Sequence, residues 1–125
     1  MGIDFVIIIP TYESVDARWS AAYFHDFRRR LAAEAGIDLE RMDGYGGEIQ
    51  WSHADPIELF LDRPDVLGEL DCIECAEVAP RLRELVAGWP DDDDDKKSAL
   101  WLAAGMERVA KLGGNDVAQT VLKFC

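Results

Sequence analysis

A short apolar run close to the N-terminus constrains the fold most strongly. Residues 3–9 (IDFVIII) are almost wholly β-branched or aromatic, and Pro10 ends the run. Such side chains favour extended backbone, and the run is shorter than an ordinary helix. We therefore predict a buried strand over these residues. A second apolar run, residues 121–125 (VLKFC), predicts another strand at the other end of the chain.

Apolar side chains follow a helical spacing after Asp16. One stripe recurs every four residues: Trp19, Tyr23, Phe27 and Leu31. Residues with this spacing lie on one face of a helix, and glycine commonly follows a helix end. The pattern predicts a helix that begins at Asp16, buries this stripe and ends at Gly36.

Three further helices are predicted from capping and helix-breaking residues. The first covers residues 55–61, which begin with an Asp cap followed by Pro. The second covers residues 72–86, and Pro80 is expected to kink or divide it. The third covers residues 98–112 and is closed by a pair of glycines.

The expected fold class is α+β and mostly helical, with four or so helices and with short N-terminal and C-terminal strands forming a small sheet. A chain of 125 residues has the length of one domain and can bury about two thirds of its unfolded surface. We therefore expect a single domain over residues 1–125. Because a two-stranded sheet has exposed edges, we also consider a homodimer that extends it.

The charge balance limits the classes of partner. The chain has 25 acidic and 13 basic residues, a formal net charge of −12 at pH 7. Nucleic acids and anionic membranes bind basic surfaces, so we expect neither as a partner. The N-terminus has neither the basic region nor the long apolar segment of an export signal, which favours a cytoplasmic location. A basic protein is the partner that suits this charge, and we expect no cofactor.

The densest negative charge lies in one run. It consists of Asp91, Asp92, Asp93, Asp94 and Asp95, and Trp89 precedes it. Tryptophan is a common anchor at protein interfaces, and the carboxylates would speed association with a basic protein. We therefore consider Trp89 and the run as a candidate partner-binding surface. The alternative is a solvated loop that leads into the last helix.

A weak calcium-loop pattern lies between the second and third of the expected helices. If Gly68 takes the sixth position of an EF-hand loop, three carboxylates fall at ligand positions. These metal-ligand candidates are Asp65, Asp71 and Glu74. However, Arg63 and Leu67 stand where two other oxygen ligands belong. The alternative is that Asp71 and Glu74 only cap a helix.

Three cysteines form the other candidate site: Cys72, Cys75 and Cys125. An odd number argues for reduced thiols and against a disulfide framework. The first two form a Cys-x-x-Cys motif at a helix start, which is compatible with redox chemistry. Together with Cys125 and either His25 or His53 they could also ligate zinc. The alternative is that the small cysteine side chains pack in the core.

Catalytic motifs are missing from the sequence. The chain has no serine nucleophile elbow, no phosphate-binding glycine loop and no paired zinc histidines. His53, in a loop near Trp51 and Asp55, is the best candidate for a general base. We therefore expect a protein that is not an enzyme.

Three stretches of the chain resemble a known family. They are residues 24–39, which open with FHDFRRRLA; residues 68–85, which end in VAPRLREL; and residues 103–125, which run from AAGM to the terminal Phe-Cys. Together they resemble a family of small acidic proteins of actinobacteria. Proteins of this kind often have Asp before the glycine of the central loop, where this chain has Leu67. The resemblance implies no reaction and no site residues.

These observations favour an acidic interaction module that binds a basic protein, as an inhibitor, immunity protein or regulator would. The reasons are the net charge of −12, the small size and the missing catalytic motifs. The alternative is a metal- or thiol-dependent protein that uses the degenerate loop or the cysteines.

Overall fold

The N-terminal apolar run lies inside a four-stranded antiparallel sheet. We analysed a computed structural model, which describes residues 2–8, 12–65, 67–113 and 120–125. Strand β1 (Gly2–Ile8) pairs with β2 (Tyr12–Ser20) on one side and with β4 (Val121–Phe124) on the other. Strand β3 (Glu69–Asp71) adds to the outer side of β4, which gives the order β2-β1-β4-β3. The expected pairing of the two ends of the chain is confirmed.

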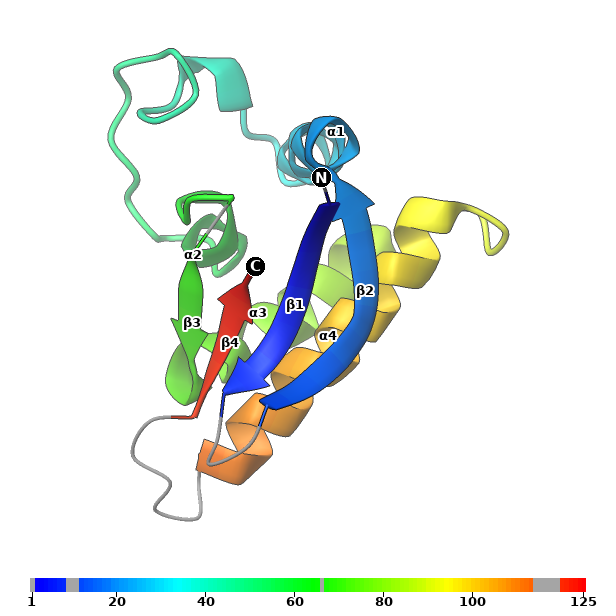
Figure 1. Cartoon of the computed structure of the whole chain (residues 1–125). Coiled ribbons are helices and arrows are strands. Elements are labelled where there is room, and N and C mark those ends of the chain that lie inside the picture. The colour runs from blue at the N-terminus through cyan, green and yellow to red at the C-terminus, as the bar shows by residue number, and fades with distance from the viewer. Residues whose placement is uncertain (1, 9–11, 66, 114–119) are drawn as a thin grey trace.

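Helices cover one face of this sheet. They are α1 (Ala21–Glu34), α2 (Ile57–Leu61), α3 (Cys72–Val86) and α4 (Asp94–Gly113), whereas the 3-10 turn η1 (Leu39–Arg41) follows α1 and stands away from the sheet. Figure 1 shows α3 and α4 side by side behind the strands, with α1 across one end of the sheet. Helix α4 reaches β2 closely at Gly105, where an added Cβ would lie 2.7 Å from a methyl group of Val15. The fold is therefore α+β and mostly helical, as expected.

Alternation along β1 explains the core. Ile3, Phe5 and Ile7 are buried on the helix-covered face, whereas the residues between them are only partly buried. Phe5 lies opposite Phe124 of β4, and their ring centroids are 4.9 Å apart. The ring of Phe24 from α1 packs 5.8 Å from Phe5, so the first helix is fixed on the same cluster. Such edge-to-face contacts add to the free energy gained by burial.

The expected helix from Asp16 is wrong in its first part. Strand β2 continues to Ser20, because Trp19 pairs with Ile3 of β1 and buries its ring on the core face. The helix begins at Ala21, and the Ser20 hydroxyl accepts a hydrogen bond from the Tyr23 backbone N–H. The change of element moves Tyr23 off the buried face, leaving it 69% exposed.

Three further expectations need correction. Helix α3 is not divided, because it runs through Pro80 as one element. Helix α4 begins at Asp94 and not near Ser98, so Asp94 and Asp95 of the acidic run lie in its first turn. The sheet has four strands and not two, and its edge strands are β2 and β3, so the homodimer that would extend an edge stays a prediction. The expected strand residue Ile9 lies outside the described residues.

Within the part of the chain that the structure describes, no helix has the length and apolar character needed to cross a membrane.

We predict that Phe24→Ala lowers the free energy of unfolding by about 3–5 kcal/mol, because it leaves a cavity in the aromatic core. The neighbouring Tyr23→Ala, on an exposed side chain, should change it by no more than about 0.5 kcal/mol. Urea unfolding of both variants measures the difference. Equal losses of unfolding free energy in the two variants would mean that Tyr23 is buried, as the helical stripe predicted from the sequence requires, and would contradict the structure.

Candidate functional site

The acidic run lies where α3 gives way to α4 and is partly used by the fold. Asp93 accepts a hydrogen bond from the Lys96 backbone N–H, which caps the start of α4, and it accepts another from Arg30 at 2.8 Å. Asp95 accepts from the indole N–H of Trp19 at 3.0 Å. The Nζ of Lys96 is buried and donates to the carbonyls of residues 87 and 89 and to Asp91. Asp91, Asp92 and Asp94 remain exposed.

Trp89 does not lie at the surface, contrary to the expectation of a partner anchor. Its side chain is only 6% exposed and belongs to the core cluster. The indole N–H donates to Glu34, and the guanidinium of Arg30 lies 3.6 Å from the ring centroid. Trp89 therefore joins α3 to α1 and offers no free ring to a partner.

The three cysteines lie in different surroundings. Cys75 is buried and its thiol faces the Leu70 carbonyl at 3.8 Å, Cys72 is half-buried, and Cys125 is exposed. Burial, together with the charges of Asp71 and Glu74, raises the pKa of the Cys75 thiol far above its ordinary value. A thiol in this state is a poor nucleophile and a poor metal ligand.

The carboxylates of the calcium-like loop are engaged in capping. Asp71 and Glu74 form a capping box at the start of α3, each accepting a hydrogen bond from the backbone N–H of the other. Arg63 forms an ion pair with Glu74. Over the described residues, no three His, Cys, Asp or Glu side chains are grouped in a way that could hold a metal ion. The metal and thiol alternatives therefore gain no support from the geometry.

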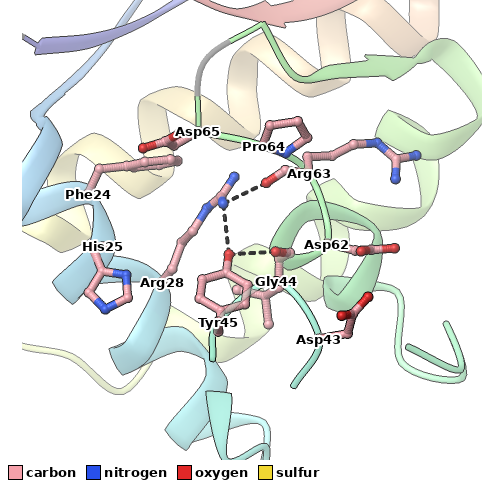
Figure 2. Close-up of a pocket in the computed structure, with 11 residues that line it drawn as sticks. Phe24, His25, Arg28, Asp43, Gly44, Tyr45, Asp62, Arg63, Pro64 and Asp65 are labelled. Atoms are coloured by element: carbon pink, nitrogen blue, oxygen red, sulfur yellow. Dashed lines mark hydrogen bonds between the residues drawn. The ribbon is translucent and has the colours of Figure 1, made fainter. Parts of the chain in front are cut away.

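The largest feature that sequence reasoning missed is a pocket around Arg28. Its volume is about 570 Å³, and it lies between α1, the glycine-rich loop and the segment that follows α2. Figure 2 shows Arg28 reaching into this space from α1, beside Tyr45 and beneath Pro64 and Asp65. In the sequence, Arg28 is one of three consecutive arginines near a helix end, and no motif separates it from the other two. Its position four residues after the buried Phe24 is the one signal that could have placed it inside.

Arg28 is held in place at one nitrogen. Its Nη1 donates to the Tyr45 hydroxyl and to the Arg63 carbonyl, both at 2.7 Å, and the Tyr45 hydroxyl donates in turn to the Leu61 carbonyl at 2.6 Å. The side chain is only 3% exposed. Burial lowers the pKa of Arg28 and raises the pKa of Tyr45. The guanidinium nevertheless stays charged at neutral pH, because arginine loses its proton only at very high pH.

Acidic residues line the pocket on both sides of Arg28, and the charge of Asp65 acts on its guanidinium. Asp43, Asp62 and Asp65 line the pocket together with His25. Asp43 and Asp65 are exposed, whereas Asp62 is half-buried and lies 2.8 Å from His53. The pocket therefore combines a positive floor with a negative mouth.

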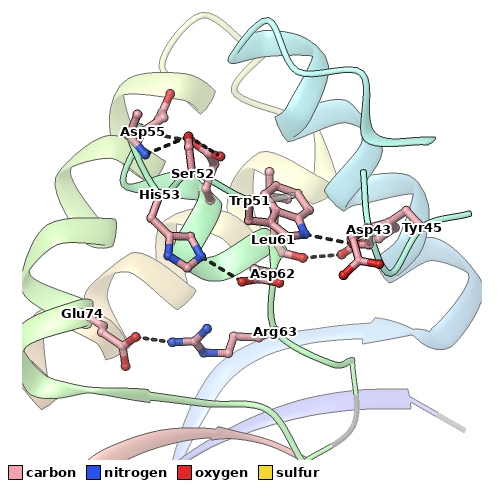
Figure 3. A network of polar contacts seen from close by, with 12 residues as sticks. Asp43, Tyr45, Trp51, Ser52, His53, Asp55, Leu61, Asp62, Arg63 and Glu74 are labelled. Carbon is pink, nitrogen blue, oxygen red and sulfur yellow. Dashed lines mark hydrogen bonds and ion pairs between the residues drawn. The ribbon is translucent and has the colours of Figure 1, made fainter. Parts of the chain in front are cut away.

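A polar network holds the wall of the pocket, as Figure 3 shows. The indole N–H of Trp51 donates to the Asp43 carbonyl at 2.9 Å, which closes the glycine-rich loop. The loop turns tightly at Gly47, where an added Cβ would lie 2.0 Å from the backbone of Arg41. Further along, Asp55 accepts from Arg81 of α3 at 2.9 Å.

The two histidines hold neither a metal nor a nucleophile. His25 is exposed on α1, with its ring centroid 6.0 Å from that of Tyr45, and Arg29 lies 3.2 Å from its Nε2. His53 is exposed and pairs with Asp62. Among the contacts described, neither histidine has a serine or cysteine side chain as its partner.

No family model, curated protein or solved structure matches this chain. Any function assigned to the chain therefore rests on its pocket and its surface charge.

We predict that a thiol reagent at pH 8 modifies Cys125 fastest and Cys75 only after unfolding. Cys125 is exposed, whereas Cys75 is buried and its raised pKa keeps it protonated. Alkylation followed by peptide mass spectrometry measures the order. Modification of Cys75 in folded protein at the rate of Cys125 would contradict the packing of α3.

The pKa of Asp55 predicts how stability depends on pH. Partial burial alone would raise this pKa, but hydrogen bonds from Arg81 and from the Ile57 backbone N–H hold it below its ordinary value. A carboxylate with a lowered folded pKa stabilises the protein above the unfolded pKa of about 4, and this stabilisation is lost as the pH falls through the folded pKa.

The difference in unfolding free energy between wild type and Asp55→Asn should therefore be larger at pH 6 than at pH 3. Urea unfolding at the two pH values measures it, and a difference that grows on acidification would refute the assignment.

Proposed function

We propose that this protein is an acidic interaction module that binds a basic protein partner, in the manner of an inhibitor, immunity protein or regulator. The binding surface is the negative mouth of the Arg28 pocket and the segment that borders it, residues 38–54, called here the 38–54 segment. The observation that carries the proposal is this mouth, where Asp43, Asp62 and Asp65 surround a cavity floored by a buried cation.

The 38–54 segment supports the proposal by its position and composition. It contains one short helical turn, η1, and stands out from the body of the protein in Figure 1. Asp38, Asp43 and Glu48 are exposed on it and accept no side-chain ion pair within the described part of the chain. Ile49, which is 45% exposed, supplies an apolar contact among them. Protein–protein interfaces commonly have an apolar centre with a polar rim around it.

The mouth and the 38–54 segment suit binding of a basic protein better than the acidic run does. Asp93 and Asp95 of the run are already neutralised by Arg30, and Asp91 is paired with Lys96. Carboxylates that the fold has not paired keep their full charge for a partner. Their field attracts basic proteins over a distance of roughly one Debye length, about 10 Å at 0.1 M salt.

The test compares two variants with equal charge change. In the first, Asp38→Asn, Asp43→Asn and Glu48→Gln neutralise the 38–54 segment; in the second, Glu77→Gln, Asp92→Asn and Asp94→Asn neutralise exposed carboxylates of α3 and the run. Each immobilised protein is incubated at 50 mM salt with extract of the cell that encodes it, and the proteins retained are identified by mass. The purified partner is then titrated against all three proteins over a series of salt concentrations.

We expect a basic protein that is retained by wild type and by the second variant and lost by the first. Its association rate should fall on the order of tenfold or more as salt rises, because charge steering is screened. Equal loss in both variants, or binding that does not respond to salt, would contradict the proposal.

A further inference from the structure

The unbonded atoms of Arg28 lie along one edge of its guanidinium. Nη1 donates to Tyr45 and Arg63, whereas Nε and Nη2 are buried and have no hydrogen-bond partner among the residues that the structure describes. Nε–H and Nη2–H point in parallel on the side of the guanidinium away from Cδ. This edge is the fork that takes both oxygens of a carboxylate in two hydrogen bonds.

The fold supplies rings around this cation but no carboxylate hydrogen-bonded to it. The guanidinium carbon lies 4.5 Å from the centroid of Phe24, 5.2 Å from that of Phe60 and 5.6 Å from that of Phe124. Cation–π contacts recover part of the lost hydration, yet two buried donors remain unsatisfied, which costs stability. The charge of Asp65 acts on Arg28, but this exposed side chain forms no hydrogen bond with the fork. The site is thus preorganised for an anion that the described fold does not provide.

We propose that the Arg28 fork binds the carboxylate of a ligand that enters the pocket. Both nitrogens are covered by neighbouring side chains, so binding includes a small side-chain displacement, as is common at binding sites. The Tyr45 and Arg63 contacts to Nη1 stay in place and keep the fork oriented.

The mouth of the pocket selects the rest of the ligand. Asp43, Asp62 and Asp65 would repel a simple anion before it reached Arg28. A ligand that also carries a cationic group satisfies both charges, with its carboxylate on the Arg28 fork and its cation beside Asp65. The ligand class is therefore a carboxylate with a basic group a few ångströms away.

Two sources provide this chemistry: a free basic α-amino acid, and the C-terminal lysine or arginine of a protein. A cavity of about 570 Å³ accommodates either. This proposal goes beyond the proposed function, because a carboxylate would bind at Arg28 whether or not a protein partner uses the 38–54 segment.

The test begins with wild-type protein and two small probes. L-arginine and agmatine share the guanidinium and the carbon chain, but agmatine lacks the carboxylate and has the larger positive charge. Surface charge alone would favour agmatine, whereas the fork favours L-arginine. We expect calorimetry to show L-arginine binding about tenfold or more tightly than agmatine, the loss expected for a pair of hydrogen bonds to a charged group. The NMR signal of the Arg28 Nε–H should shift with L-arginine alone.

Two peptide probes distinguish the sources. A peptide that ends in arginine with a free carboxyl group should bind, and its C-terminal amide should not. Tighter binding of the free-acid peptide than of L-arginine identifies a protein C-terminus as the ligand, and weaker binding identifies the amino acid. Either result supports carboxylate binding at the Arg28 fork.

A matched pair of variants tests the residue itself. Arg28→Lys keeps the charge but cannot form the fork, and Arg29→Lys makes the same change on the exposed neighbour. L-arginine binding should be lost in the first variant and kept in the second. If Arg28→Lys fails to fold, the comparison of L-arginine with agmatine on wild type decides the question.

Equal affinity for L-arginine and agmatine, or no binding of L-arginine at millimolar concentration, would overturn the inference. This outcome differs from failure of the proposed function, which appears only in the capture of a partner by the 38–54 variants.

Discussion

The pairing of β1 with β4 is the interaction on which the rest of the structure depends. It joins the two ends of the chain and brings Phe5 and Phe124 into contact. The Phe24 and Phe60 rings complete this cluster from α1 and from α2. The cluster sets the position of Arg28, whose guanidinium lies over three of these rings. The core and the pocket are consequently one unit, and the aromatic packing that stabilises the fold also forms the floor of the site.

Charge has two separate uses in this molecule. Part of the negative charge is internal: Asp93 and Asp95 fasten α4 to Arg30, and Lys96 joins the end of α3 to the start of α4. Another part is exposed at the pocket, where Asp43 and Asp65 are among the lining residues of the cavity beside Arg28. The net charge of −12 is therefore larger than the unpaired negative charge on any one surface. The local arrangement, and not the total, is what supports binding of a ligand with charges of both signs.

The sequence predicts the strands and most helices of this fold because their signals are local. The β-branched run of β1 and the capping residues Asp71 and Glu74 specify structure within a few residues. The helix expected from Asp16 failed because pairing with β1, a contact between distant residues, overrides the spacing of Trp19 and Tyr23. The pocket could not be predicted for the same reason. Arg28, Tyr45 and Arg63 meet only in the folded chain, and no motif links them.

If the Arg28 fork is a receptor for a carboxylate, a crystal structure with L-arginine bound will show it most directly. We expect the ligand's carboxylate within hydrogen-bond distance of both Nε and Nη2, with its guanidinium beside Asp65. A structure in which the Asp65 carboxylate fills the fork, or in which L-arginine lies elsewhere on the acidic surface, would contradict it.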